Sequence, residues 1–94
     1  MIVGAALLEL HVHGSQSLKA KRGVVRSITG RVRNRFNVSV AEVGGQDTWQ
    51  RATLGFAVVA SEARLAEEVL DAIDRFLWDR PEIEVVGGET HWLA

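Results

Sequence analysis

The spacing of apolar residues switches along the chain between the two-residue period of a strand and the period of a helix. The order of these segments constrains the fold more than any other feature. Residues 2–13 alternate between two faces with a period of two, which predicts a strand. Residues 18–36 follow with apolar side chains at helical spacing, after Ser15 and Ser17, either of which can cap a helix. The apolar stripe of this helix is Leu18, Val25, Ile28, Val32 and Phe36.

Two further strands are predicted on either side of a turn. Residues 37–43 place Val38 and Val40 on one side, and residues 49–60 again alternate with a period of two. Between them lie residues 44–47, whose sequence GGQD is typical of a turn. The middle of the chain therefore predicts a β-hairpin.

A second helix and a last strand complete the pattern. Ser61 is the expected N-cap of this helix, and Pro81 ends it. Residues 82–93 predict a strand, with an irregularity expected at the two glycines of residues 87–88. The buried stripe of the second helix is predicted to be Leu65, Val69, Ile73, Phe76 and Leu77.

The resulting order is β-α-β-β-α-β, which favours one α+β architecture. Strand–helix–strand units strongly prefer a right-handed crossover, and two such units joined by a hairpin give the ferredoxin-like sandwich. We expect a single domain over residues 1–94, with a four-stranded antiparallel sheet in the order 4-1-3-2 and both helices on one face. The residues expected to be buried are Leu8, Leu10, Val25, Ile28, Phe56, Val58, Val69 and Ile73.

Three motifs carry a resemblance to a known family. They are SLKAKR (17–22), RFNVSVAEV (35–43) and DTWQRATLGFAVV (47–59), of which the last two are the more specific. In this order and spacing they resemble the YlxP-like family of small bacterial proteins of uncharacterised function, over nearly the whole chain. The resemblance implies a ferredoxin-like fold and a loose association with translation, since such genes often lie beside those for ribosome-associated factors. It implies no established activity or site, and Gly23 and Gly30 stand where helix formers are expected.

The composition excludes several classes of protein. The chain has no cysteine, so disulfides and thiolate chemistry are excluded and a reducing cytoplasm is the expected location. The N-terminal apolar run lacks a basic leading region and breaks at Glu9, so it does not predict a signal peptide. No segment is long enough to span a membrane, and no membrane partner is expected.

Positive charge is concentrated in the first predicted helix. Residues 14–41 hold seven of the eleven Lys and Arg residues and no acid, although the net charge is −1. At 100° per residue, four of these cations fall within an arc of roughly 60°: Lys19, Arg22, Arg26 and Arg33. Gly23 and Gly30 adjoin the arc, and Lys21 lies at the edge of the apolar stripe, where its ammonium group can reach water.

Two interpretations of this arc stay open. The four cations can contact RNA phosphates, with little discrimination between sequences. Alternatively, they can pair with acids on the second helix, which lies alongside in this fold. Arg64 with Glu68 and Asp71 with Arg75 can instead pair within the second helix, which favours an exposed basic arc.

The sheet face opposite the helices is expected to be apolar and uncovered. A contiguous apolar face of this kind favours self-association, either through the face itself or through the edge strands. Base stacking on this face is disfavoured, because its central strands offer one aromatic side chain, that of Trp49. Trp78 either folds back over the end of its helix or anchors a partner. The expected partner face comprises Val3, Leu7, Trp49, Arg51 and Val59.

No catalytic site, metal site or cofactor is predicted. His11 and His13 share one face of the first strand, whereas His91 is expected near the opposite end of that strand. No single ion therefore reaches all three, and no carboxylate cluster is expected at ligand spacing around the pair. Glu42 or Asp47 is expected to pair with Arg51, and no nucleophile–base pair is found.

Two functions from different classes therefore stay open. The first is a non-catalytic cytoplasmic module that binds RNA or the ribosome through the basic arc. The second is a protein-interaction or self-assembly module, a dimer or larger, that uses the sheet face and has no role with nucleic acids.

Overall fold

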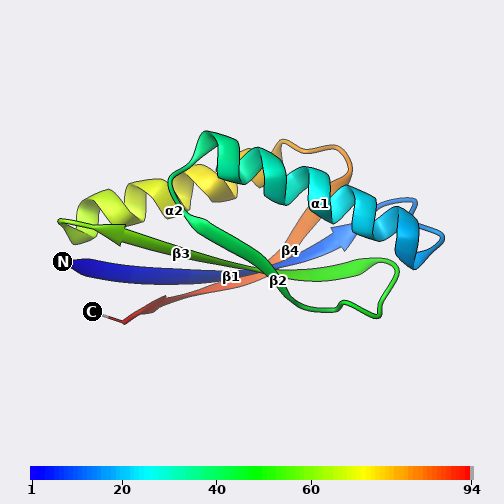
Figure 1. Ribbon diagram of the computed structural model, residues 1–94, viewed down its shortest axis with the longest axis horizontal. Helices are drawn as coiled ribbons and strands as arrows, with labels where there is room; N and C mark the ends of the chain where they lie inside the picture. The colour runs from blue at the N-terminus through cyan, green and yellow to red at the C-terminus, as the bar shows by residue number, and fades with distance from the viewer. Residues whose placement is uncertain (94) are drawn as a thin grey trace.

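The computed structural model describes residues 1–93, and its elements follow the predicted β-α-β-β-α-β order (Figure 1). Ser17 caps the first helix as expected, since its hydroxyl accepts a hydrogen bond from the Ala20 N–H at 3.0 Å. The elements are β1 (Ile2–Val12), α1 (Leu18–Arg35), β2 (Ser39–Gly44), β3 (Arg51–Ala60), α2 (Ala63–Trp78) and β4 (Ile83–Trp92).

The four strands form one antiparallel sheet in the order β2-β3-β1-β4, which is the predicted order 4-1-3-2 read from the other edge. The central strand β1 pairs with β3 from Ile2–Ala60 to His11–Arg51, and with β4 on its other side. Both helices lie on one face of this sheet, and the other face has no covering layer (Figure 1). Among residues 1–93, neither helix is long and apolar enough to cross a membrane.

The core lies between the sheet and the helices. Every second residue of β1 from Gly4 to Val12 is buried, as a strand with one covered face requires. Of the eight residues expected to be buried, all are buried except Val69, which is only half-buried. The buried stripe of α2 is Ala66, Leu70, Ile73 and Leu77, because the helix is rotated so that Ala66 lies against the core.

Two local predictions were wrong. The strand β3 begins at Arg51 rather than at Trp49, which is an exposed residue of the preceding loop. The N-cap of α2 is Glu62 rather than Ser61, and its side chain makes no capping hydrogen bond.

The irregularity expected at Gly87-Gly88 is present as a β-bulge at Val86. Leu10 pairs with Val85, but the preceding Glu9 pairs with Gly87, so Val86 is an extra residue in β4. The bulge changes which residues of β4 face the core. Without the extra residue, Val85 would pair with His11 and its side chain would point to the uncovered face. With the bulge, Ile83 and Val85 enter the core, and Glu84 faces the uncovered side opposite His11.

Candidate functional site

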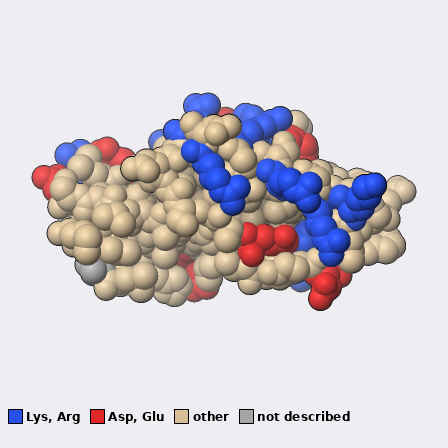
Figure 2. Space-filling model, in the orientation of Figure 1, with Lys and Arg blue, Asp and Glu red and all other residues tan. Residues whose placement is uncertain are grey.

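The four cations of the predicted arc are all exposed on α1, and we call them the basic face: Lys19, Arg22, Arg26 and Arg33. Figure 2 shows Lys and Arg side chains gathered over this helix. None of the four forms an ion pair with an acid among residues 1–93. Arg33 donates a hydrogen bond to the carbonyl of Val40 at 3.0 Å, which holds its guanidinium group at the edge strand β2.

The remaining cations of α1 have partners of their own. Arg31 lies 3.9 Å from the carboxylate of Glu82, and the guanidinium carbon of Arg35 lies 5.2 Å from the centre of the Phe76 ring. No cation of α1 pairs with an acid of α2 among the described residues. Lys19, Arg22 and Arg26 are therefore the cations of α1 whose side chains have no partner among the described residues.

The two glycines of α1 border open space. Apart from its chain neighbours and the backbone of its own helix, a Cβ atom added at Gly23 or at Gly30 would meet no atom within 4 Å. Each glycine costs about 1 kcal/mol relative to alanine inside a helix. Since no packing contact requires either glycine, the helix surface beside the basic face is unusually open to an approaching molecule.

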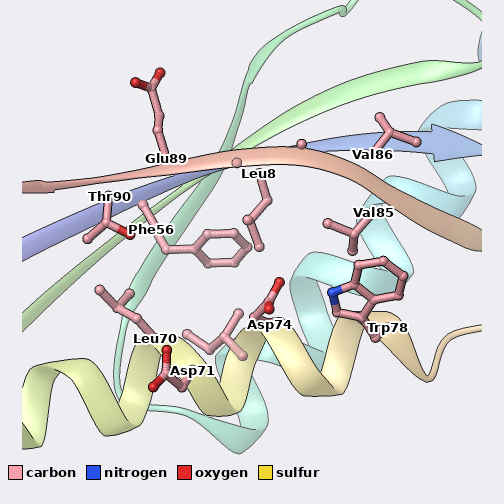
Figure 3. A pocket seen from close by; sticks show the side chains of 14 residues that line it. Leu8, Phe56, Leu70, Asp71, Asp74, Trp78, Val85, Val86, Glu89 and Thr90 are labelled. Carbon is pink, nitrogen blue, oxygen red and sulfur yellow. The ribbon is translucent and has the colours of Figure 1, made fainter.

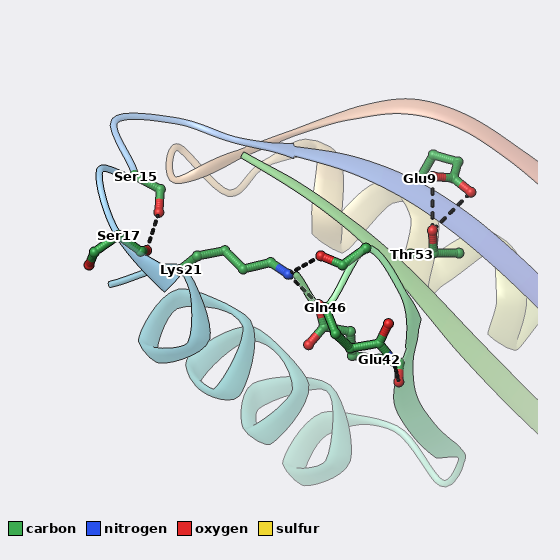
Figure 4. Close-up of polar contacts among 8 residues, drawn as sticks. Glu9, Ser15, Ser17, Lys21, Glu42, Gln46 and Thr53 are labelled. Atoms are coloured by element: carbon green, nitrogen blue, oxygen red, sulfur yellow. Dashed lines mark hydrogen bonds and ion pairs between the residues drawn. The ribbon is translucent and has the colours of Figure 1, made fainter. Parts of the chain in front are cut away.

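Lys21 does not reach water as the sequence suggested. Its side chain is 0% exposed, and its ammonium group lies 2.6 Å from the Glu42 carboxylate and 2.6 Å from the carbonyl oxygen of Gly45 (Figure 4). Gly45 adopts φ +75°, and a Cβ there would lie 2.9 Å from the Arg51 carbonyl oxygen, so this turn needs glycine. The prediction that Glu42 or Asp47 pairs with Arg51 is wrong, since neither pair is formed among residues 1–93 and the Glu42 carboxylate bonds Lys21 instead.

The uncovered face of the sheet carries most of the expected partner residues. Val3 and Leu7 of β1 are half-buried, while Arg51 and Val59 of β3 are exposed. Val59 is 64% exposed. A shallow hollow of about 220 Å³ lies on this face near β2, lined in part by Leu7, Val43 and Ala57. We call this surface the outer sheet face.

A cleft of about 500 Å³ between α2 and the edge strand β4 has no counterpart in the sequence analysis (Figure 3). Val85, Val86, Gly88 and Thr90 are among the residues that line it from β4. Trp78 lines the cleft and is 60% exposed, so it is not folded away over the end of its helix. The remaining lining includes Leu8, Phe56, Leu70, Asp71, Ile73 and Asp74.

The histidines of β1 have a neighbour that the sequence analysis missed. His91 pairs with Ala5 at the far end of β1, as expected. However, His11, His13 and Glu84 can place one ligand atom each within 4.8 Å of one another. The sequence analysis did not place Glu84 beside the pair, because its position depends on the bulge at Val86, which turns Glu84 to this side.

Comparison with known proteins places the chain in a family. The family described as "Protein of unknown function (DUF503)" matches residues 3–90. The chain is also 42% identical over 92 residues to the "Uncharacterized protein YlxP" of Bacillus subtilis (strain 168), a match that covers 98% of this chain and 100% of that protein. The resemblance read from the three motifs is thereby confirmed, and the chain belongs to the DUF503 family, whose function is not established.

Proposed function

We propose that the protein is a non-catalytic cytoplasmic module that binds RNA, or the RNA of the ribosome, through the basic face of a ferredoxin-like scaffold. One observation carries this proposal: Lys19, Arg22 and Arg26 have no acidic partner among residues 1–93. The chain contains twelve acids and eleven Lys and Arg residues, so the absence of partners does not follow from a shortage of acids.

The arrangement costs stability, which supports a binding role. Arg22 and Arg26 stand four residues apart, and like charges at this spacing destabilise a helix by about 0.2–0.5 kcal/mol. Gly23 and Gly30 add their own cost to the same helix surface. Phosphates would relieve the repulsion between the cations, and the glycines would let a nucleic-acid backbone approach closely.

The contact would be made to phosphates rather than to bases. Lys and Arg that neutralise phosphates release condensed counterions, so affinity depends steeply on salt concentration and little on base sequence. On the outer sheet face, the described residues of β1 and β3 include no Phe, Tyr or Trp side chain, and their one ring there is the imidazole of His11 near the end of β1, so a platform of aromatic side chains for base stacking is missing. The basic face therefore accounts for the binding without help from the sheet.

Arg22→Gln/Arg26→Gln should lower the affinity for ribosomal RNA at low salt and reduce the slope of log K against log salt by roughly one to two units. The fold should be retained, because both side chains are exposed. Electrophoretic mobility shifts across a salt series would measure the affinity. The matched control is Arg64→Gln/Arg75→Gln on α2, which removes the same charge elsewhere and should keep the parent's slope. A parent that does not bind, or a double variant that binds like the parent, would contradict the proposal.

A second candidate function is self-association through the outer sheet face. It is favoured by the exposure of Val59 and by Val43, which is also exposed beside the shallow hollow on β2. Burying this face against a second copy would remove its apolar side chains from water.

The protein should therefore sediment as a dimer or larger species, and Val59→Asp should shift it towards the monomer. Analytical ultracentrifugation over a range of concentrations would measure this, with Arg64→Gln on the helix layer as the control. A monomeric parent at high concentration would remove the argument for self-association and leave the proposed RNA contact unaffected.

A further inference from the structure

Two imidazoles and a carboxylate meet at the end of the sheet where β1 leaves it. The His11 and His13 rings pack edge to face with their centres 5.0 Å apart, and Glu84 of β4 pairs directly with His11. No group among residues 1–93 forms a side-chain hydrogen bond or ion pair with any of the three. Three side chains that are good metal ligands thus lie together, and none of their ligand atoms is engaged in a hydrogen bond or ion pair within residues 1–93.

Their spacing suits a transition-metal ion after a small adjustment. Their ligand atoms lie within 4.8 Å of one another, whereas Zn–N distances of 2.0–2.1 Å in a tetrahedral site bring ligand atoms to about 3.3 Å. His13 lies beyond the end of β1 in the turn, and both it and Glu84 are exposed, so their side chains are free to rotate. His11 is half-buried on the strand and would fix the position of the ion.

The charges around the cluster permit a cation. Arg51 is the residue of β3 directly opposite His11 in the sheet, and it brings a positive charge. Glu9 lies two residues before His11 on the same face, and both of its carboxylate oxygens accept from the Thr53 hydroxyl, at 2.9 and 3.0 Å (Figure 4). The carboxylates of Glu9 and Glu84 outnumber the guanidinium group of Arg51, so these three side chains bring a net negative charge to the surroundings of the two imidazoles.

We propose that His11, His13 and Glu84 bind a divalent late transition-metal ion, with Zn²⁺ the most suitable. Imidazole favours Zn²⁺, Ni²⁺ and Cu²⁺ over Mg²⁺ or Ca²⁺, which prefer oxygen ligands. Two histidines and one carboxylate leave a fourth coordination position to water, as in zinc sites with three protein ligands. The ion would join β1 to the edge strand β4, next to the bulge that positions Glu84.

The proposal is tested by titrating tag-free protein with ZnCl₂ in a calorimeter. The parent should bind one Zn²⁺ per chain. Loss of groups that only support metal ligands typically costs 10–100-fold in affinity, so His11→Asn, His13→Asn and Glu84→Gln should each weaken binding at least about tenfold. The matched control is His91→Asn, which removes a histidine at the other end of β1 and should bind Zn²⁺ like the parent.

A second measurement locates the ion without relying on variants. In proton–nitrogen spectra of the imidazoles, Zn²⁺ should shift the signals of His11 and His13 and leave those of His91 in place. No saturable binding by the parent, or equal weakening in the His91→Asn variant, would overturn the site. Shifts confined to His91 would overturn it as well.

Discussion

Replacing Glu42 with alanine should lower the free energy of unfolding by about 3–5 kcal/mol, because it leaves a buried charge without its partner. The Lys21 side chain is 0% exposed, and its ammonium group would retain only the Gly45 carbonyl as acceptor. The Glu42 side chain is itself only 17% exposed, so the two charges meet largely away from water. Urea denaturation followed by circular dichroism would give the change in free energy.

A double variant distinguishes the charge effect from lost packing. Lys21→Met/Glu42→Leu removes both charges and keeps apolar volume, so it should recover most of the stability lost in Glu42→Ala. The control is Arg64→Ala, which breaks the exposed pair with Glu68 on α2 and should change stability by less than about 1 kcal/mol. A Glu42→Ala protein as stable as the parent would show that Lys21 finds water or another acceptor.

Leu10→Ala should cost about 2–5 kcal/mol in the free energy of unfolding. Leu10 is 1% exposed at the middle of the sheet, where it pairs with Ala52 on one side and Val85 on the other. Truncation would remove buried methyl groups and leave a cavity that the paired strands cannot easily collapse. For a domain of this size the loss would be a large part of the total stability.

The same denaturation experiment measures this loss, and Val59→Ala is the matched control. Val59 lies on β3 with its side chain on the uncovered face, so its truncation should cost far less than that of Leu10. Equal losses in the two variants would mean that the uncovered face is as well packed as the core.

The amino-acid sequence determined the elements and their order, because these depend on local periodicity. Local spacing shows which face of each element is apolar. Examples are the alternation in residues 2–13 and 49–60 and the helical stripe of Val25, Ile28 and Val32. An antiparallel β-α-β-β-α-β chain with right-handed crossovers then has few arrangements open to it, so the strand order followed as well. The exposure of the basic face was predictable for the same reason, since helical angles depend only on spacing.

The tertiary structure alone decided which distant side chains meet. Lys21 looked like a solvated residue beside an apolar stripe until the β2–β3 turn brought Glu42 and Gly45 to its ammonium group. One extra residue at Val86 turned Glu84 towards His11, and the packing of α2 against β4 left a cleft lined by Trp78. Periodicity within an element fixes a side chain's face but not its partner across the sheet or between layers. Those partners depend on the register between strands, on bulges and on how large side chains of different elements pack together. No single segment of the sequence encodes these features.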